Sequence, residues 1–222
     1  MCLCLCLTLA GAASAQTHYK PRVSIGGHAG VSMGRVELSP SVPQTYLMGT
    51  TGAVTFRFTE EKLFGLVAEL GWTQRGWKED FEESPLQYSR TLTYINLPVM
   101  TQIIFGTRRF KSFINLGPQV SYMISNSISA NFDYKDLSSV HDWPQRRRMT
   151  EQLDMDIKNK FDYGIAGGLG FEFYVQPRHS ITVEGRYYYG LGNIFPSSKA
   201  DTFSASRLSA IEVTVGYNFR LK

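Results

Sequence analysis

The 222-residue sequence has only three cysteines, and Cys2, Cys4 and Cys6 all lie at its N-terminus. The same stretch is apolar and ends in Ala13-Ser14-Ala15, the small-x-small pattern that signal peptidases cut. We therefore predict a signal peptide over residues 1–15 and one mature domain over residues 16–222. Because that domain would contain no cysteine, disulfide and thiolate chemistry are excluded from its expected functions.

Long apolar runs and charge of one sign are also scarce. Past the N-terminal stretch, no segment approaches the run of about 18 apolar residues that a spanning helix needs. A helical membrane protein is therefore excluded, although 43% of the residues are hydrophobic. The net charge of +4 is modest, so we expect no nucleic-acid partner.

Aromatic residues and glycine are abundant: 13% of the residues are aromatic and 20 are glycine. Residues 161–175 illustrate how they are used. One register of this segment is aromatic and aliphatic, while the other is small or polar and carries Asp162 and Glu172. Such alternation is typical of a β-strand with two different faces. In a soluble protein the apolar face would cover a core, and in a transmembrane barrel it would meet lipid.

The two-residue periodicity recurs along most of the chain. It predicts eight strands, over residues 21–33, 47–58, 64–77, 90–105, 110–125, 161–175, 180–192 and 207–222. Pro98 and Pro118 fall inside two of them and predict local interruptions, because proline has no N–H to donate to a neighbouring strand.

The connections between these segments decide which solvent the apolar face meets. Long connections, at residues 34–46, 78–89, 126–160 and 193–206, alternate with short ones, at residues 59–63, 106–109 and 177–179. A soluble sandwich has no reason to place every short turn at one end, whereas transmembrane barrels do so. We therefore predict an all-β fold, an eight-stranded antiparallel up-and-down transmembrane β-barrel with short periplasmic turns and longer extracellular loops. The expected lipid-facing residues include Leu70, Ile95, Leu116, Leu169, Val183 and Val213.

The opposite register would face the inside of the barrel. It carries four bases and four acids: Arg57, Glu69, Arg75, Glu172, Glu184, Arg186, Glu212 and Arg220. Since unpaired charges are costly to bury, the equal numbers predict a paired charge network that plugs the interior. We expect the last three strands to share much of it. A wrong register on one strand, which would put some of these residues in loops, is the alternative.

The sequence also resembles the PorT family of small outer-membrane β-barrels. The segments that carry the resemblance are GLVAELGWTQRGWK (65–78), YINLPVMTQIIFG (94–106), FINLGPQVSYMIS (113–125), FDYGIAGGLGFEF (161–173), ITVEGRYYYGLGNI (181–194) and VTVGYNFRL (213–221). The resemblance implies an eight-stranded barrel in the outer membrane of a double-membraned bacterium. The founding member is associated with a protein-secretion and gliding apparatus, and the family has no catalytic motif to carry over.

Chemistry-bearing residues are few. His179, Ser180 and Glu184 look like a hydrolase set, but nearness in sequence does not make a catalytic triad. No spacing of His, Asp or Glu matches a metal-ligand pattern. We expect no catalytic residue, no cofactor and no metal.

The 126–160 connection contains a basic run next to a tryptophan. Trp143, Arg146, Arg147 and Arg148 are candidates for contact with lipid phosphates or a protein partner. The whole connection carries six bases and six acids, however, so a solvated loop is the favoured interpretation.

These observations favour a non-enzymatic outer-membrane barrel that serves as a structural or interaction scaffold in the cell envelope, with a role in a secretion or envelope complex. A small gated channel or a rim-located lipid-modifying enzyme is the alternative. The expected partners are outer-membrane lipid, lipopolysaccharide and an envelope protein.

Overall fold

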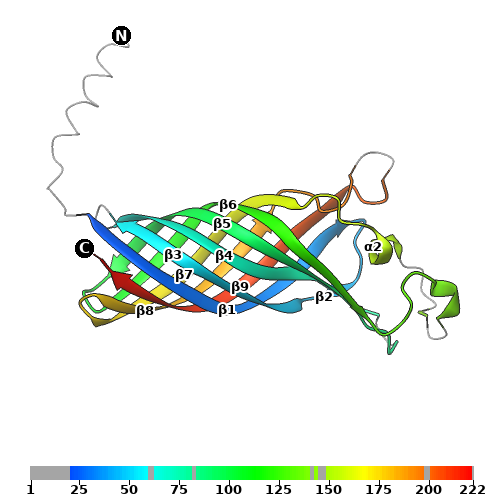
Figure 1. Ribbon diagram of the computed structural model, residues 1–222, viewed down its shortest axis with the longest axis horizontal. Coiled ribbons are helices and arrows are strands. Elements are labelled where there is room, and N and C mark those ends of the chain that lie inside the picture. Colours follow the sequence, from blue (N-terminus) through cyan, green and yellow to red (C-terminus); the bar gives the residue numbers. More distant parts are fainter. Residues whose placement is uncertain are drawn as a thin grey trace, which may run out of the picture.

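The computed structural model describes residues 21–59, 63–81, 84–140, 143–144, 149–197 and 201–221. Eight long strands make up most of this part of the chain (Figure 1). They are β1 (Arg22–Ser39), β3 (Leu47–Thr59), β4 (Phe64–Glu79), β5 (Tyr88–Gly106), β6 (Phe110–Ala130), β7 (Phe161–Gln176), β8 (His179–Gly190) and β9 (Ala205–Arg220). The predicted eight-stranded fold is confirmed.

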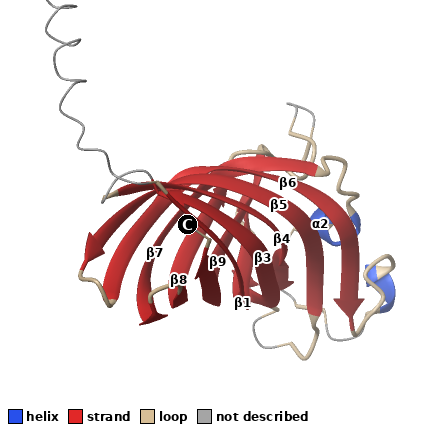
Figure 2. Ribbon diagram, turned by 60° about the vertical axis from the view of Figure 1, so that its left-hand side comes forward, coloured by secondary structure: helices blue, strands red, loops and turns tan. Residues whose placement is uncertain are grey.

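The eight strands close into a ring. Each long strand pairs antiparallel with the next along the chain, and β9 pairs with β1. The pairing of β4 with β5 completes the closure, so each of the eight long strands pairs with a neighbour on both sides. A short strand, β2 (Gln44–Thr45), adds to β4 at the rim. Figure 2 shows the strongly tilted strands of this wall.

The two ends of the barrel differ. The described chain starts and finishes at one end, together with the short turns, while the long connections lie at the other (Figure 1). Gly106 begins the turn between β5 and β6. Its φ of +122° is a backbone conformation that residues other than glycine rarely adopt. The longest connection carries a 3-10 helix, η2 (Leu137–Ser139), and a one-turn helix, α2 (Glu151–Asp154). No helix among the described residues is both long and apolar enough to cross a membrane.

The outer surface carries an aliphatic band between two rings of aromatic side chains. The six residues predicted to face lipid are all exposed on it, from Val183 at 39% to Leu169 at 65%. The ring nearer the termini contains Phe64, Phe105, Phe110, Phe171, Phe173 and Tyr217. The other ring contains Trp72, Tyr122, Phe161, Tyr163 and Tyr187. Paired aromatic girdles of this kind mark the two interfaces of a membrane.

Several strands continue beyond the second aromatic ring. There the polarity of the two faces is exchanged, so that inward residues are apolar and outward residues are polar. In β1, predicted to end at residue 33, Val36 and Leu38 are buried inside while Arg35 and Glu37 point outward. In β5 the buried residues of this level include Tyr88 and Leu92. The wall therefore projects past the membrane band. Sequence analysis ended these strands too early because the apolar face moves from the outside to the inside.

The two prolines interrupt the sheet as predicted. Between β4 and β5 the pairing stops at Ala68 and Val99 and resumes in the same register at Gly71 and Asn96, which skips Pro98. Between β5 and β6 it stops at Pro98 and Gln119 and resumes at Thr101 and Leu116, which skips Pro118. Because proline has no N–H group, hydrogen bonds between the strands are lost at these two places, but the register of the strands does not shift.

Candidate functional site: the filled barrel interior

Inward-facing polar side chains fill the barrel at the level of the lipid-facing band. Arg186 lies at the centre of this layer, one residue after Gly185, which pairs with the lipid-facing Leu169. Seven of the eight predicted interior charges are buried, and Arg220 is only partly buried. Alternation places them there because β-strand side chains point to opposite faces in turn.

Arg186 holds two carboxylates at once. Its Nη1 and Nη2 donate to the two oxygens of Glu69 at 2.6 and 3.0 Å, which is a bidentate pair across the barrel from β8 to β4. Its Nε and Nη2 donate to Glu184, two residues earlier on β8, at 3.0 and 3.1 Å. Two-pronged guanidinium–carboxylate pairs are the strong class of ion pair.

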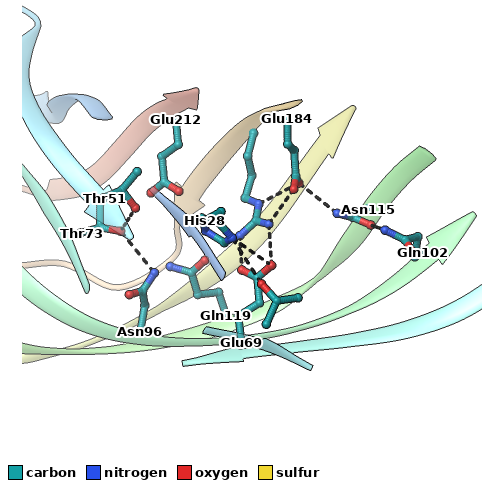
Figure 3. A network of polar contacts seen from close by, with 12 residues as sticks. His28, Thr51, Glu69, Thr73, Asn96, Gln102, Asn115, Gln119, Glu184 and Glu212 are labelled. Atoms are coloured by element: carbon teal, nitrogen blue, oxygen red, sulfur yellow. Dashed lines mark hydrogen bonds and ion pairs between the residues drawn. The ribbon is translucent and has the colours of Figure 1, made fainter. Parts of the chain in front are cut away.

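Amide side chains extend this cluster along the wall. Asn115 on β6 donates to Glu184 at 3.0 Å, and Gln102 on β5 donates to Asn115 at 2.9 Å (Figure 3). His28 on β1 lies with its Nδ1 3.9 Å from Glu69. One guanidinium, two carboxylates and their amide neighbours therefore connect β8, β4, β6 and β5 through the interior.

A second ion pair crosses the barrel closer to the termini. Arg57 on β3 donates to Glu172 on β7 at 2.9 Å. The same carboxylate oxygen accepts the Ser180 hydroxyl at 2.7 Å. Both charged residues are buried, so each depends on the other for compensation.

A third pair lies nearer the extracellular end. Arg75 on β4 is 3.4 Å from the Glu212 carboxylate on β9. Its guanidinium also stacks 3.8 Å from the centre of the Tyr188 ring, a cation–π geometry. The Tyr188 hydroxyl donates to Asp162 at 2.8 Å.

The predicted network on the last three strands needs correction. Of that set, Glu184 and Arg186 contact each other, but Glu172 and Glu212 pair with arginines of β3 and β4. Arg220 forms no ion pair within the described residues, and its guanidinium lies 5.1 Å from the Tyr174 ring centre. The pairing runs across the barrel because a narrow eight-stranded wall brings opposite strands within side-chain reach.

Little space remains between these side chains. A cavity of about 10 Å³ lies among residues that include His28, Arg57, Glu69 and Glu184. About 10 to 15 Å³ is needed for a single water molecule. This cavity among the central charged side chains is therefore no larger than one water molecule.

An apolar cluster fills the extracellular end of the barrel. It joins inward residues of the projecting wall to side chains from the long connections. Its buried members include Trp77, Leu153, Ile157, Phe195, Phe203 and Leu208. We call this the apolar cap. Sequence analysis missed it, although the inward position of Val36, Leu38 and Leu208 follows from the register of the strands.

Hydrogen bonds tie the long connection to the wall beneath it. The Tyr88 hydroxyl donates to the Leu153 carbonyl at 2.7 Å, and Arg90 donates to the Met155 carbonyl at 2.7 Å. Gln152 donates a hydrogen bond to the Glu79 carboxylate at 3.2 Å. The same carboxylate accepts a hydrogen bond from the Trp77 indole N–H at 3.1 Å. Burial raises the pKa of Tyr88, so its phenol stays protonated and keeps donating.

Of the four candidate contact residues in this connection, the structure describes Trp143. Arg146, Arg147 and Arg148 lie outside the described residues. Trp143 is half-buried, with its ring 5.8 Å from Phe81 and 5.9 Å from Phe132. Its ring therefore packs within the cap. Residues 1–15, the expected signal peptide, also lie outside the described part.

The three residues that resemble a hydrolase set have separate partners. Ser180 donates to Glu172, His179 contacts the Tyr217 hydroxyl, and Glu184 pairs with Arg186. Their side chains do not form a serine–histidine–carboxylate chain. Within the described residues, no three His, Cys, Asp or Glu side chains are grouped to hold a metal ion.

Comparison with known families shows to which family the chain belongs. The model of the family described as "Outer membrane protein beta-barrel domain" matches residues 14–196. No curated protein matches the sequence.

Solved structures that are similar to this chain share little sequence with it. OprG from Pseudomonas aeruginosa is 12% identical with a TM-score of 0.51, over 90% of this chain and 95% of that one. Outer Membrane Protein W of E. coli is 14% identical with a TM-score of 0.42, over 91% and 100%. The outer membrane enzyme PagL is 12% identical with a TM-score of 0.38, over 88% and 98%. At 12% identity, the likeness to OprG concerns the fold alone.

Proposed function

Because the chain belongs to the outer membrane protein beta-barrel domain family, we propose that this integral outer-membrane barrel is a non-enzymatic scaffold that docks an envelope partner. One observation carries the proposal: the interior is filled at two levels. Ion pairs cross the polar layer from β8 to β4 and from β3 to β7, and the apolar cap fills the extracellular end. A filled barrel is suited to presenting its ends rather than to passing a solute.

The extracellular end offers a shaped surface for docking. Its long connection is anchored through Leu153 and Met155 to the strands below. Such anchoring lowers the entropy lost on binding, because the loop is already held in place. Lipopolysaccharide surrounds this end in the outer leaflet and is a second proposed contact.

Membership in the PorT group, and with it a role in a secretion complex, is the finer form of this proposal. Its support is the ordered set of six sequence segments, of which residues 161–173 and 213–221 form much of β7 and β9. The scaffold proposal does not depend on it.

Two measurements test the scaffold proposal. In planar bilayers the purified barrel should give no large steady single-channel currents, since the cavity among the central charged side chains has room for about one water. A photo-crosslinking residue at the exposed loop position Lys135 should give a discrete protein adduct in native outer membrane, and one at the lipid-facing Leu169 should not. Steady currents, or no adduct specific to Lys135, would remove the basis of the proposal.

A further inference from the structure

A cavity of about 1190 Å³ opens at the end of the barrel that carries the termini. The β5–β6 turn, the β7–β8 turn, the start of β1 and the end of β9 surround it. Its charged lining residues are Arg22, Arg108, Arg109, Lys111 and Arg220. We call it the basic mouth, since five cations and no carboxylate line it among the residues that the structure describes.

Tyr174 lies between two of these cations. The Lys111 ammonium is 3.4 Å from the Tyr174 hydroxyl and 4.9 Å from its ring centre. The Arg220 guanidinium lies 5.1 Å from the same ring centre. Both side chains are partly buried and point into the barrel from different strands, so they converge on one place.

The nearest interior carboxylate is already engaged. Glu172 is opposite Lys111 in the β6–β7 ladder, but it accepts hydrogen bonds from Arg57 at 2.9 Å and Ser180 at 2.7 Å. In the described part of the chain, neither Lys111 nor Arg220 forms an ion pair. The basic mouth therefore differs from the polar layer above it, where every buried arginine has a carboxylate partner.

Positive charges that converge in a partly enclosed cavity raise the local potential and concentrate anions there. From this convergence we infer that the basic mouth binds the phosphate group of an anionic phosphate ester. Guanidinium groups match phosphate oxygens in a bidentate manner, and a phosphate offers several acceptors to several cations at once. A single carboxylate would leave most of the donors unused.

Two sources could supply this phosphate: the headgroup of an anionic phospholipid of the inner leaflet, or a free phosphate ester in the periplasm. Both reach the end of the barrel that carries the short turns. The inference concerns this end alone, so it is independent of the scaffold proposal, which rests on the filled interior and the extracellular end.

Binding to the full mature barrel in a non-ionic detergent tests the inference. The probes are inorganic phosphate and dihexanoyl phosphatidylglycerol, with zwitterionic dihexanoyl phosphatidylcholine for comparison, followed by calorimetry. Lys111→Gln and Arg220→Gln should each weaken binding about tenfold, the size expected for one charge-assisted hydrogen bond. Arg178→Gln is the matched control, since Arg178 lies in the β7–β8 turn but does not line the cavity.

The outcomes separate the sources. Binding of both anionic probes would indicate recognition of the phosphate group itself, and binding of phosphatidylglycerol alone would indicate a lipid headgroup. Equal weakening by Arg178→Gln, no binding of either probe, or binding of a polyglutamate peptide in their place would overturn the inference. Heat-modifiable gel mobility checks folding, and Arg108→Gln in the exposed turn replaces a variant that does not fold.

Discussion

The barrel wall has opposite designs above and below the second aromatic ring. Within the membrane band it is apolar outside and polar inside, as with Leu169 and Arg186. Above that ring it is polar outside and apolar inside, as with Arg35 and Val36 on β1. A single strand changes from one design to the other without leaving the sheet. The comparison teaches that the polarity of each strand face matches the solvent at that height of the barrel. It is not constant along the strand.

The two levels are consequently held together by different forces. Lipid on the outside gives no hydrophobic gain for burying side chains within the membrane band, so specific polar contacts such as Arg186 with Glu69 connect the interior there. Water surrounds the projecting part, and burial of Trp77 and Phe195 stabilises it by the hydrophobic effect. The predictions below test this division.

The largest expected effect comes from the centre of the polar layer. Arg186→Ala should destabilise the barrel by about 3 to 5 kcal/mol, because it leaves Glu69 and Glu184 buried without their cation. Urea unfolding in lipid vesicles, followed by heat-modifiable mobility, measures the loss. Arg186→Met combined with Glu69→Gln and Glu184→Gln should recover much of the stability, since it removes all three charges. A single variant as resistant as its parent would show that these ion pairs do not hold the interior.

A charge placed on the outer surface tests the change of solvent directly. Leu169→Arg should cost about 2 to 4 kcal/mol and impair insertion, the penalty for arginine near the bilayer midplane. Thr91→Arg, on the outward face of β5 above the aromatic ring, should be nearly neutral. Insertion into vesicles followed by protease protection compares the two. If Thr91→Arg impaired insertion as much as Leu169→Arg, the membrane would not end at the second ring.

How far the sequence predicts this molecule depends on the level. In the membrane band the alternation keeps one sign, so the strands, the lipid face and the inward position of residues such as Arg57 could be assigned from it. The projecting ends of the strands were not predicted, because the polarity of the two faces is exchanged there, at Gly34 and Arg35 in β1. The pairing of Arg186 with Glu69, which is 117 residues away, depends on strand stagger in the closed barrel, which local periodicity does not specify.

A smaller effect is expected where the cap meets the wall. Tyr88→Phe removes the donor to the Leu153 carbonyl and should cost about 1 kcal/mol, the net value of one buried hydrogen bond. The loss is local, so limited proteolysis of the 131–160 connection should become faster while the strands stay protected. Tyr46→Phe at the rim, where the ring is 47% exposed, is the matched control. Unchanged proteolysis of Tyr88→Phe would indicate that apolar packing alone holds the connection.

The smallest effect is expected at the ion pair on the outside of the projecting wall. Arg35 and Glu37 lie two residues apart on β1, with their charged groups 3.4 Å apart and both side chains substantially exposed. Water screens such a pair, so Arg35→Gln should cost no more than about 0.5 kcal/mol, and added salt should reduce even that. Arg186→Ala is the buried counterpart, because Arg186 also pairs with a glutamate two residues away on its own strand, in addition to Glu69 across the barrel. Unfolding measured at low and high salt provides the test. If the two variants were equally destabilising, height in the barrel would not determine how much an ion pair contributes, and the division between a polar layer and an apolar cap would have to be abandoned.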